Sequence, residues 1–329
     1  LSACVGIFMA LRGYGAWALV GQYLTKSAAD VIVISLLSGW RPRLVFSIDS
    51  IRAVYGFGWK IAVSSVTDAL YRQLRSLVIG VKYTSADLAF YDKGNQFPSL
   101  LITNVDSTIA NVLMPILSRM QEDRQAVKDT VRKAIQISST VLFPALIGLA
   151  VCGESVITLI LTEKWLPCVP YLRCLCIALM IKPLQTANFQ GLLAIGRSDV
   201  YLRVQMAQKA VGVFVILVTA LLFDSVLLIA AGEIAAYVLF ELINVRPNRV
   251  YLNYTLSEHI ADFLPQLLVA LVMGGAVFLI GTLRSPGFFT LVLQVTIGAA
   301  VYIAILRLPP FLFLLRFLLQ KRKKEEQHD

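Results

Sequence analysis

Long apolar segments recur along the whole chain, and they constrain its fold more than any other feature. Most of them contain about 20 residues, the length at which a helix crosses a hydrocarbon core of about 30 Å. We predict ten crossings, at residues 1–11, 15–40, 58–82, 87–118, 134–160, 169–195, 203–223, 225–245, 263–282 and 287–306. The predicted fold class is therefore an all-α integral membrane protein, a polytopic helical bundle.

The composition supports this class. Hydrophobic residues make up 57% of the chain and charged residues 15%, and the mean hydropathy is +0.73, far from the balance of a soluble domain. The sequence lacks the run of alternating segments of roughly 10 residues that an outer-membrane barrel requires. The first apolar segment begins at Leu1 and is half the usual length. We therefore expect residues to be missing before it; the alternative is a signal peptide, although the basic start of one is lacking here.

The distribution of basic residues predicts an orientation. When alternate connections are assigned to opposite sides, one set contains 20 of the 30 Lys and Arg residues and the other contains 6. Because cytoplasmic loops are enriched in Lys and Arg, the first set is predicted to be cytoplasmic, together with the C-terminus. The net charge of +10 then follows from topology and from the basic tail. It does not indicate nucleic-acid binding.

Three charged residues lie in the interior of the predicted crossing 58–82, away from its two ends. An ionised side chain at mid-membrane costs at least about 2.5–3.5 kcal/mol, so such residues usually face a partner or a hydrated cavity. Asp68, Arg72 and Arg75 are spaced i, i+4 and i+7 and share one face of a helix. An alternative is that Asp68 and Arg72 pair with each other and only hold the bundle together.

Two further crossings carry polar faces. The crossing 87–118 contains polar residues at intervals of four and three: Asp92, Gln96, Ser99, Thr103 and Asp106, with Lys93 beside them. In the crossing 169–195, Lys182, Gln185 and either Asn188 or Phe189 share a face, and Pro183 should bend the helix. Together, the three crossings predict a hydrated cavity with excess positive charge. Its expected cargo is a large polar anion carrying phosphate or diphosphate groups.

Signals for catalysis are weak. The sequence contains no nucleophile elbow, no Gly-rich phosphate loop and no catalytic paired-carboxylate motif in a loop. The adjacent Glu122 and Asp123 lie in a basic cytoplasmic loop and are interpreted as a solvated surface. The two histidines, His259 and His328, are assigned to a loop and to the tail, and the five cysteines are scattered. We therefore predict no catalytic residue, no metal site and no cofactor.

Several segments resemble a known family. They are "GYGAWALVGQ" (13–22), "WRPRLVFS" (40–47), "LVIGVKYTSADLAFYDKGNQFPSLL" (77–101), "EKWLPCVPYLRCLC" (163–176) and "LLAIGRSDVYLRV" (192–204). They are similar to the polysaccharide-transporter family of lipid-linked oligosaccharide flippases, in particular the colanic and teichuronic acid exporters. This family belongs to the multidrug, oligosaccharidyl-lipid and polysaccharide exporter superfamily.

The resemblance implies two six-helix lobes around a central cavity, with most of the N-terminal lobe missing here. The expected parts are 1–40, the end of the N-terminal lobe; 41–57, an amphipathic linker in the cytoplasmic interface; 58–247, the C-terminal six-helix lobe; 248–308, two additional helices; and 309–329, a basic cytoplasmic tail. An alternative for the linker is that it is the start of the next helix.

The resemblance also implies a function: flipping of undecaprenyl-diphosphate-linked oligosaccharides across the bacterial inner membrane. Arg72, Arg75 and Lys182 would hold the diphosphate, and Asp68 would balance charge or bind a coupling cation. The polar stripe of 87–118 would bind the sugars, and Lys93, Gln185 and Asn188 are further expected substrate-binding residues. A proton or sodium gradient would drive transport. Expected partners are the lipid-linked oligosaccharide, membrane lipids, and the polysaccharide polymerase and export machinery.

Two alternatives remain from the sequence. The first is a multidrug or cation exporter of the same superfamily, which would need an acidic or aromatic cavity. The second is a membrane glycosyltransferase or polymerase that acts on a lipid-linked glycan. A structural scaffold is a third reading, favoured only if removing the charges leaves function intact.

Overall fold

The computed structural model describes residues 2–15, 17–37, 48–283 and 287–307, and no strand occurs among them. The helices are α1 (Ser2–Leu11), α2 (Trp17–Leu37), α3 (Ile48–Lys82), α4 (Ser85–Arg119), α5 (Arg124–Val151), α6 (Gly153–Leu161), a 3-10 helix (Glu163–Cys168), α7 (Val169–Leu179), α8 (Lys182–Ala194), α9 (Ser198–Leu222), α10 (Val226–Leu252), α11 (Leu256–Leu283) and α12 (Phe288–Arg307). The predicted all-α class is confirmed.

Within these residues, eight helical segments are long and apolar enough to cross a membrane. The segment Glu163–Ala194 counts as one of them, and α3, which contains the charges discussed above, does not. Eight of the ten predicted crossings correspond to these segments, whereas those at 1–11 and 58–82 correspond to the short helix α1 and to α3.

Two of the matched crossings need correction. The crossing predicted at 134–160 ends at Val151, where Cys152 and Gly153 start the separate helix α6. The crossing predicted at 169–195 is divided into α7 and α8, as expected near Pro183. His259, which was assigned to a loop from the sequence, lies in the first turn of α11.

The chain divides into two compact units, Leu1–Tyr55 and Gly56–Asp329. In the first unit, α1 and α2 form a helical hairpin. Its connection contains Gly13 and Gly15 at φ angles of 80° and 52°, where a side chain would be strained. The predicted linker 41–57 lies partly outside the described residues. Its described part belongs to α3, and its interfacial position stays a prediction.

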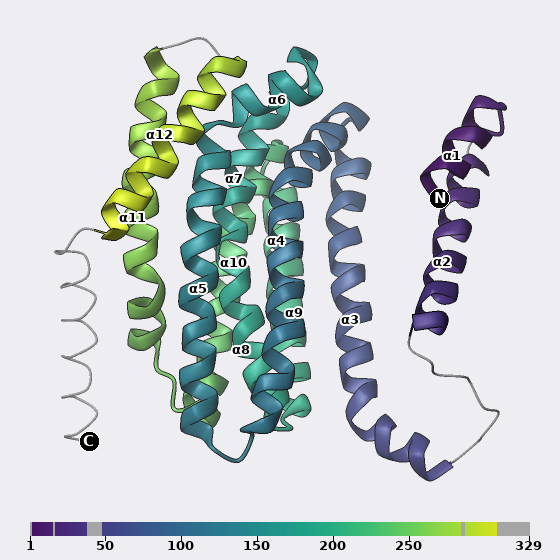
Figure 1. Ribbon diagram of the computed structural model, residues 1–329, viewed down its shortest axis with the longest axis vertical. Coiled ribbons are helices and arrows are strands. Elements are labelled where there is room, and N and C mark those ends of the chain that lie inside the picture. The colour runs from purple at the N-terminus through teal and green to yellow at the C-terminus, as the bar shows by residue number, and fades with distance from the viewer. Residues whose placement is uncertain (1, 16, 38–47, 284–286, 308–329) are drawn as a thin grey trace. The chain divides into compact units, whose positions relative to one another are not determined.

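In the second unit, α4, α5 and α7–α11 pack as a bundle (Figure 1). The N-terminal half of α5 supplies fully buried Val127, Val131 and Ile135, which pack with residues of α8 and α11 in one hydrophobic cluster. Two connections begin helices by capping: Thr84 and Asp87 form a capping box at α4, and Asp123 caps α5. These local signals set where the membrane helices begin.

Close packing of α4 against α7 depends on Gly94. A Cβ atom at this position would lie 2.9 Å from the carbonyl oxygen of Cys168 and 3.0 Å from the backbone nitrogen of Leu172. Because both atoms belong to the backbone, they cannot move aside as a side chain would. The glycine therefore permits a helix contact that any larger residue would push apart.

Helix α3 contacts the bundle largely through long side chains. At its C-terminal end, Lys82 pairs with Asp224 at 2.8 Å and also donates to the carbonyl oxygen of Phe223 at 3.0 Å. Asp224 lies in the connection between α9 and α10, and the hydrogen bond from the Lys82 ammonium group lowers the pKa of its carboxyl group. Near the middle of α3, Gly212 of α9 leaves room for the ring of Tyr71, because a Cβ there would lie 2.5 Å from the Tyr71 hydroxyl oxygen.

Candidate functional site

A cavity of about 270 Å³ lies between α3, α8, α9 and α10. Four helices supply its lining: Ser64, Ser65, Asp68 and Arg72 from α3; Lys182, Gln185, Thr186 and Phe189 from α8; Tyr201, Gln205, Gln208 and Lys209 from α9; and Tyr237 and Phe240 from α10. Nearly all of these side chains carry a hydrogen-bonding group. The cavity is therefore polar although its helices are apolar elsewhere.

Asp68 is the central acidic residue of this cavity. One carboxylate oxygen lies 2.5 Å from Nζ of Lys209 and the other lies 3.0 Å from Nη1 of Arg72. The side chain of Lys209 is 13% exposed, whereas that of Arg72 is 64% exposed. Lys209 therefore belongs to the cavity wall, and Arg72 presents a guanidinium group that a ligand can reach.

Lys182 enters the cavity because of a break in the helix. Helix α7 ends at Leu179 and α8 begins at Lys182, with Pro183 in its first turn. Proline fits the first turn of a helix because its missing N–H would have no partner there. Lys182 Nζ lies 3.5 Å from a carboxylate oxygen of Asp106 on α4. This pair joins the cavity to the polar face of α4.

Two amide side chains connect the cavity to the backbone of α10. Gln208 donates to the carbonyl oxygen of Phe240 at 2.9 Å, and Gln185 donates to that of Tyr237 at 3.5 Å. The ring of Phe189 meets the ring of Tyr201 edge-on, with centroids 5.1 Å apart. These contacts hold α8, α9 and α10 around one space.

The charges of the cavity do not cancel. Arg72, Lys182 and Lys209 line it, while Asp68 is the one carboxylate among its lining residues. Counting Asp106, which pairs with Lys182 from α4, three cations still face two anions. The structure thus brings together four predicted residues, Asp68, Arg72, Lys182 and Gln185, in a cavity with excess positive charge.

The predicted pairing of Asp68 with Arg72 is also present, so the alternative considered from the sequence describes a real contact. Asp68 has a second partner, however, because its other carboxylate oxygen pairs with Lys209. Lys209 was not identified from the sequence as a residue of this site. Helix α9 begins at Ser198, so Lys209 lies well inside it. Its i+4 spacing from Gln205 could have indicated a polar face.

Arg75 lies outside the cavity, in contrast to the prediction. It forms an ion pair of 2.8 Å with Glu233 of α10, with side chains only 10% and 3% exposed. Arg75 also donates to the hydroxyl groups of Tyr71 and Tyr91, and Tyr91 donates to Glu233. Arg75 shares a helix face with Arg72 but lies about 4.5 Å further along the axis, where the tyrosines close the space.

Asn188 is likewise placed differently from the prediction. Phe189 lines the cavity, and Asn188 is fully buried with no hydrogen-bond partner for its amide among the described residues. The reason is helical geometry: Lys182, Gln185 and Phe189 follow i, i+3 and i+7, which is one face, and Asn188 points away from it. The sequence had left both residues open.

The polar stripe of α4 lies outside the cavity on an accessible face. Asp92, Gln96 and Thr103 are exposed. Lys93 donates to Gln96 at 3.0 Å and Ser99 to Asn95 at 2.9 Å. The stripe reaches the cavity at its last member, Asp106. Its side chains remain available for further hydrogen bonds.

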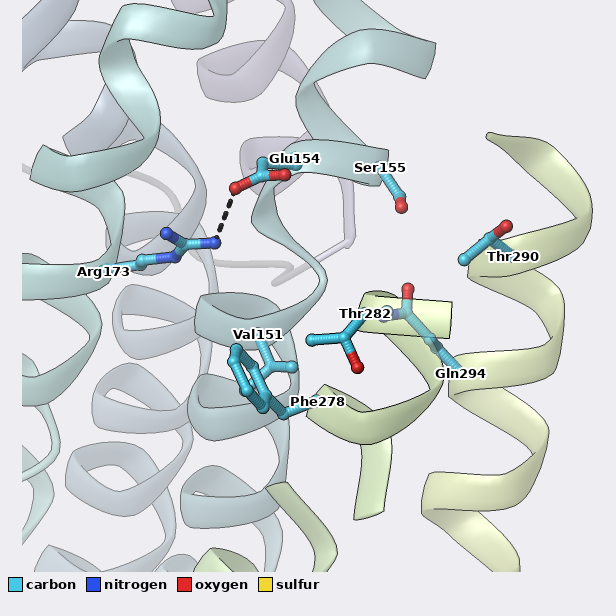
Figure 2. A pocket seen from close by; sticks show the side chains of 9 residues that line it. Val151, Glu154, Ser155, Arg173, Phe278, Thr282, Thr290 and Gln294 are labelled. Carbon is cyan, nitrogen blue, oxygen red and sulfur yellow. Dashed lines mark hydrogen bonds and ion pairs between the residues drawn. The ribbon is translucent and has the colours of Figure 1, made fainter. Parts of the chain in front are cut away.

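Another cavity, of about 230 Å³, lies between the ends of α5 and α11 and the helices α6, α7 and α12 (Figure 2). Figure 2 shows Glu154 joined to Arg173, with Thr282, Thr290 and Gln294 on the side of α11 and α12. The Glu154–Arg173 distance is 2.9 Å. Because Glu154 neutralises Arg173, this cavity should attract an anionic ligand more weakly than the cavity around Asp68.

Comparison with known proteins identifies the family. Residues 1–170, just over half of the chain, match the family described as polysaccharide biosynthesis protein. The chain belongs to this family.

Three curated relatives agree with the family. The succinoglycan biosynthesis transport protein ExoT of Rhizobium meliloti is 25% identical over 50% of this chain and 33% of that protein. The teichuronic acid biosynthesis protein TuaB of Bacillus subtilis is 25% identical over 55% of this chain and 38% of that protein. The lipopolysaccharide biosynthesis protein WzxC of Escherichia coli is 23% identical over 77% of this chain and 53% of that protein. The chain thus spans between a third and about half of these relatives.

A solved structure shares the fold. The lipid II flippase MurJ, in its inward closed conformation, superposes with a TM-score of 0.70 over 91% of this chain and 63% of that chain, at 16% sequence identity. At this identity the likeness concerns the fold, and it confirms the predicted flippase-like helical architecture. With eight apolar helical segments in the described residues and these relatives, the chain is a multi-pass membrane protein.

Proposed function

We propose that this protein moves a diphosphate-linked, lipid-anchored oligosaccharide across the bacterial inner membrane, with its C-terminus in the cytoplasm. The observation that carries the proposal is the excess of cations in the cavity between α3, α8, α9 and α10. Phosphate groups favour Arg forks and Lys point charges. The relatives support the substrate class, since their names connect them with surface polysaccharides.

The size of the cavity suggests a division of the substrate. A volume of about 270 Å³ lies near the lower end for small-ligand sites, about 300–1,000 Å³. It suits a diphosphate with one adjoining sugar and not a whole oligosaccharide. In this proposal Arg72, Lys182 and Lys209 hold the diphosphate, and the polar stripe of α4 contacts the remaining sugars.

The cation-exporter alternative is less well supported. A cationic drug would be repelled by three cations facing two anions. No observation here favours a glycosyltransferase or polymerase over transport. The relatives include a protein named as a transport protein, which fits translocation without a new covalent bond.

The test compares export by Lys209→Ala, Lys182→Ala and Arg72→Ala in cells that lack their own exporter, with the gene expressed in full. Arg203→Ala is the matched control, because Arg203 lies on α9 with its side chain 80% exposed. Each charge-assisted contact contributes about 1.5–3 kcal/mol, so each cavity variant should lower export roughly tenfold or more. Finished lipid-linked precursor should accumulate inside. Normal export by all three variants, at equal membrane levels, would contradict the assignment.

A further inference from the structure

The cavity between α5, α6, α7, α11 and α12 shares no lining residue with the cavity around Asp68. Gln294 of α12 lines it and is only 2% exposed. Its amide nitrogen donates to the carbonyl oxygen of Val277 on α11 at 3.4 Å, whereas its Oε1 has no hydrogen-bond partner among the described residues. Figure 2 shows this oxygen pointing towards the space between Ser155 and Thr282. A buried acceptor of this kind requires a donor.

Two neighbours of Gln294 on α11 fix the arrangement of acceptors. A Cβ atom at Gly281 would lie 2.8 Å from the amide nitrogen of Gln294, so the glycine leaves room for this amide. The hydroxyl group of Thr282 donates to the carbonyl oxygen of Leu279 at 2.9 Å. Since its single proton is used in this way, the hydroxyl oxygen can act only as an acceptor towards the cavity. Helices α11 and α12 therefore each present one acceptor.

The opposite wall of the cavity supplies one anion and one cation. Nη2 of Arg173 lies 2.9 Å from Oε1 of Glu154, and Nε of Arg173 donates to the carbonyl oxygen of Ala150 at 3.2 Å. These contacts leave Oε2 of Glu154 and Nη1 of Arg173 without a further contact of this kind to the described part of the chain. The side chains are 43% exposed for Arg173 and 49% exposed for Glu154. A ligand can therefore reach both groups.

These groups together match a zwitterion. A primary ammonium group has three N–H donors and no acceptor, which suits three acceptors that include a carboxylate. A guanidinium group suits a phosphate. Phosphoethanolamine carries both partners on one short chain. A choline headgroup has no N–H donor, and a glycerol headgroup has no cation. The volume of about 230 Å³ lies below the usual 300–1,000 Å³ of small-ligand sites, which suits a headgroup and not a whole lipid.

The surroundings of the cavity are apolar and favour a lipid as the source of this headgroup. Phe278 lines the cavity and is 56% exposed, and Leu279 next to it is 63% exposed. At the start of α12, Phe288 and Phe289 are also exposed. Both helices are long and apolar enough to cross a membrane. The cavity lies at their connected ends, on the side predicted to be outside the cytoplasm, where headgroups of the outer leaflet would be.

We propose that this cavity binds the headgroup of an ethanolamine phospholipid from the outer leaflet. The phosphate contacts Arg173, and the ammonium group donates to Glu154, Gln294 and Thr282. The acyl chains lie along the exposed apolar side chains of α11 and α12. Because the walls come from α6 and α7 on one side and from α11 and α12 on the other, a bound headgroup joins the last two helices to the rest of the bundle.

The test is native mass spectrometry of the protein, expressed from its full gene and purified in detergent. The protein is incubated with equal amounts of phosphatidylethanolamine, phosphatidylcholine and phosphatidylglycerol that carry identical acyl chains. One charge-assisted hydrogen bond corresponds to about tenfold in affinity. Phosphatidylethanolamine should therefore bind about tenfold or more tightly than phosphatidylcholine.

Variants separate the two ends of the headgroup. Glu154→Gln and Gln294→Leu should abolish the preference for ethanolamine over choline and leave binding of phosphatidylcholine nearly unchanged. Arg173→Ala should weaken both lipids, because both carry the phosphate. Two controls should leave the preference intact: Lys164→Ala, which removes an exposed cation on the same predicted side, and Thr296→Val, which removes an exposed hydroxyl group of α12.

Equal binding of the ethanolamine and choline lipids by the unchanged protein, or an unchanged preference in Glu154→Gln, would overturn the proposal. If Gln294→Leu does not fold, Glu154→Gln decides, because its side chain is half exposed. Displacement of the bound lipid by soluble phosphoethanolamine or by a hexose would also overturn it, since the cavity would then hold a free zwitterion or a sugar. Export by the variants of the other cavity is a separate readout, so either proposal can fail alone.

Discussion

Asp68 carries the charge balance of the cavity, because both of its oxygens are occupied by cations from different positions. Lys209 approaches one oxygen from α9, and Arg72 approaches the other from the next turn of α3. A single carboxylate thus joins α3 to α9 and offsets part of the repulsion between two nearby cations.

The Asp68–Lys209 pair can be tested by a double-mutant cycle with Asp68→Asn and Lys209→Met. Because the partly buried pair is a direct contact, we expect a coupling energy of about 0.5–3 kcal/mol in the free energy of unfolding in detergent. The Asp68→Asn and Arg203→Met cycle is the comparison, since Arg203 pairs instead with Asp199. Additive effects for both cycles would mean that the Asp68–Lys209 contact contributes nothing.

The Arg75–Glu233 pair should be structural. Removing one partner with Arg75→Met leaves a buried, uncompensated carboxylate, which costs about 3–5 kcal/mol. Arg75→Met combined with Glu233→Met should recover most of that loss in the free energy of unfolding. A substrate contact would behave otherwise: Arg75→Met would reduce export while the protein kept its stability.

At the scale of helices, the contact between α4 and α7 sets the position of the polar stripe. Gly94 lies within this stripe region, and its missing side chain lets the two backbones approach. Asp92 and Gln96 stay exposed because the glycine side of α4 faces α7 instead. The rotation of α4 that places Gly94 against α7 therefore also places Asp92 and Gln96 on the exposed face.

Gly94→Ala should lower the free energy of unfolding by about 1–3 kcal/mol, the usual cost of overpacking. Gly275→Ala is a matched control in α11, because a Cβ atom there meets nothing within 4 Å. Thermal unfolding of both purified variants in the same detergent checks this. Equal stability of the two variants would show that the α4–α7 contact can relax.

For the whole molecule, the predicted orientation can be tested at two exposed connections. Glu122 lies between α4 and α5, on the side predicted to be cytoplasmic, and Asp224 lies between α9 and α10 on the other side. In a cysteine-free background, a membrane-impermeant maleimide added to intact cells should label Asp224→Cys and not Glu122→Cys. The opposite labelling would invert the topology, and equal labelling would contradict both assignments.

The sequence by itself determined the helical class, the positions of most crossings and the existence of a polar interior. Those features depend on apolar length, on caps such as Thr84 with Asp87, and on i, i+4 spacing, all of which are local. It also placed Asp68, Arg72, Lys182 and Gln185 together, because a charge inside an apolar segment needs a polar neighbour.

Only the tertiary structure decided which charges share a partner. Lys209 pairs with Asp68, Arg75 with Glu233, and His259 with Glu241, each between two different helices. Helical spacing predicts the direction in which a side chain points from the axis of its helix. It does not predict the height along that axis at which a neighbouring helix places the partner. That height is fixed by packing, through close contacts such as Gly212 on Tyr71 and the buried turn at Tyr254.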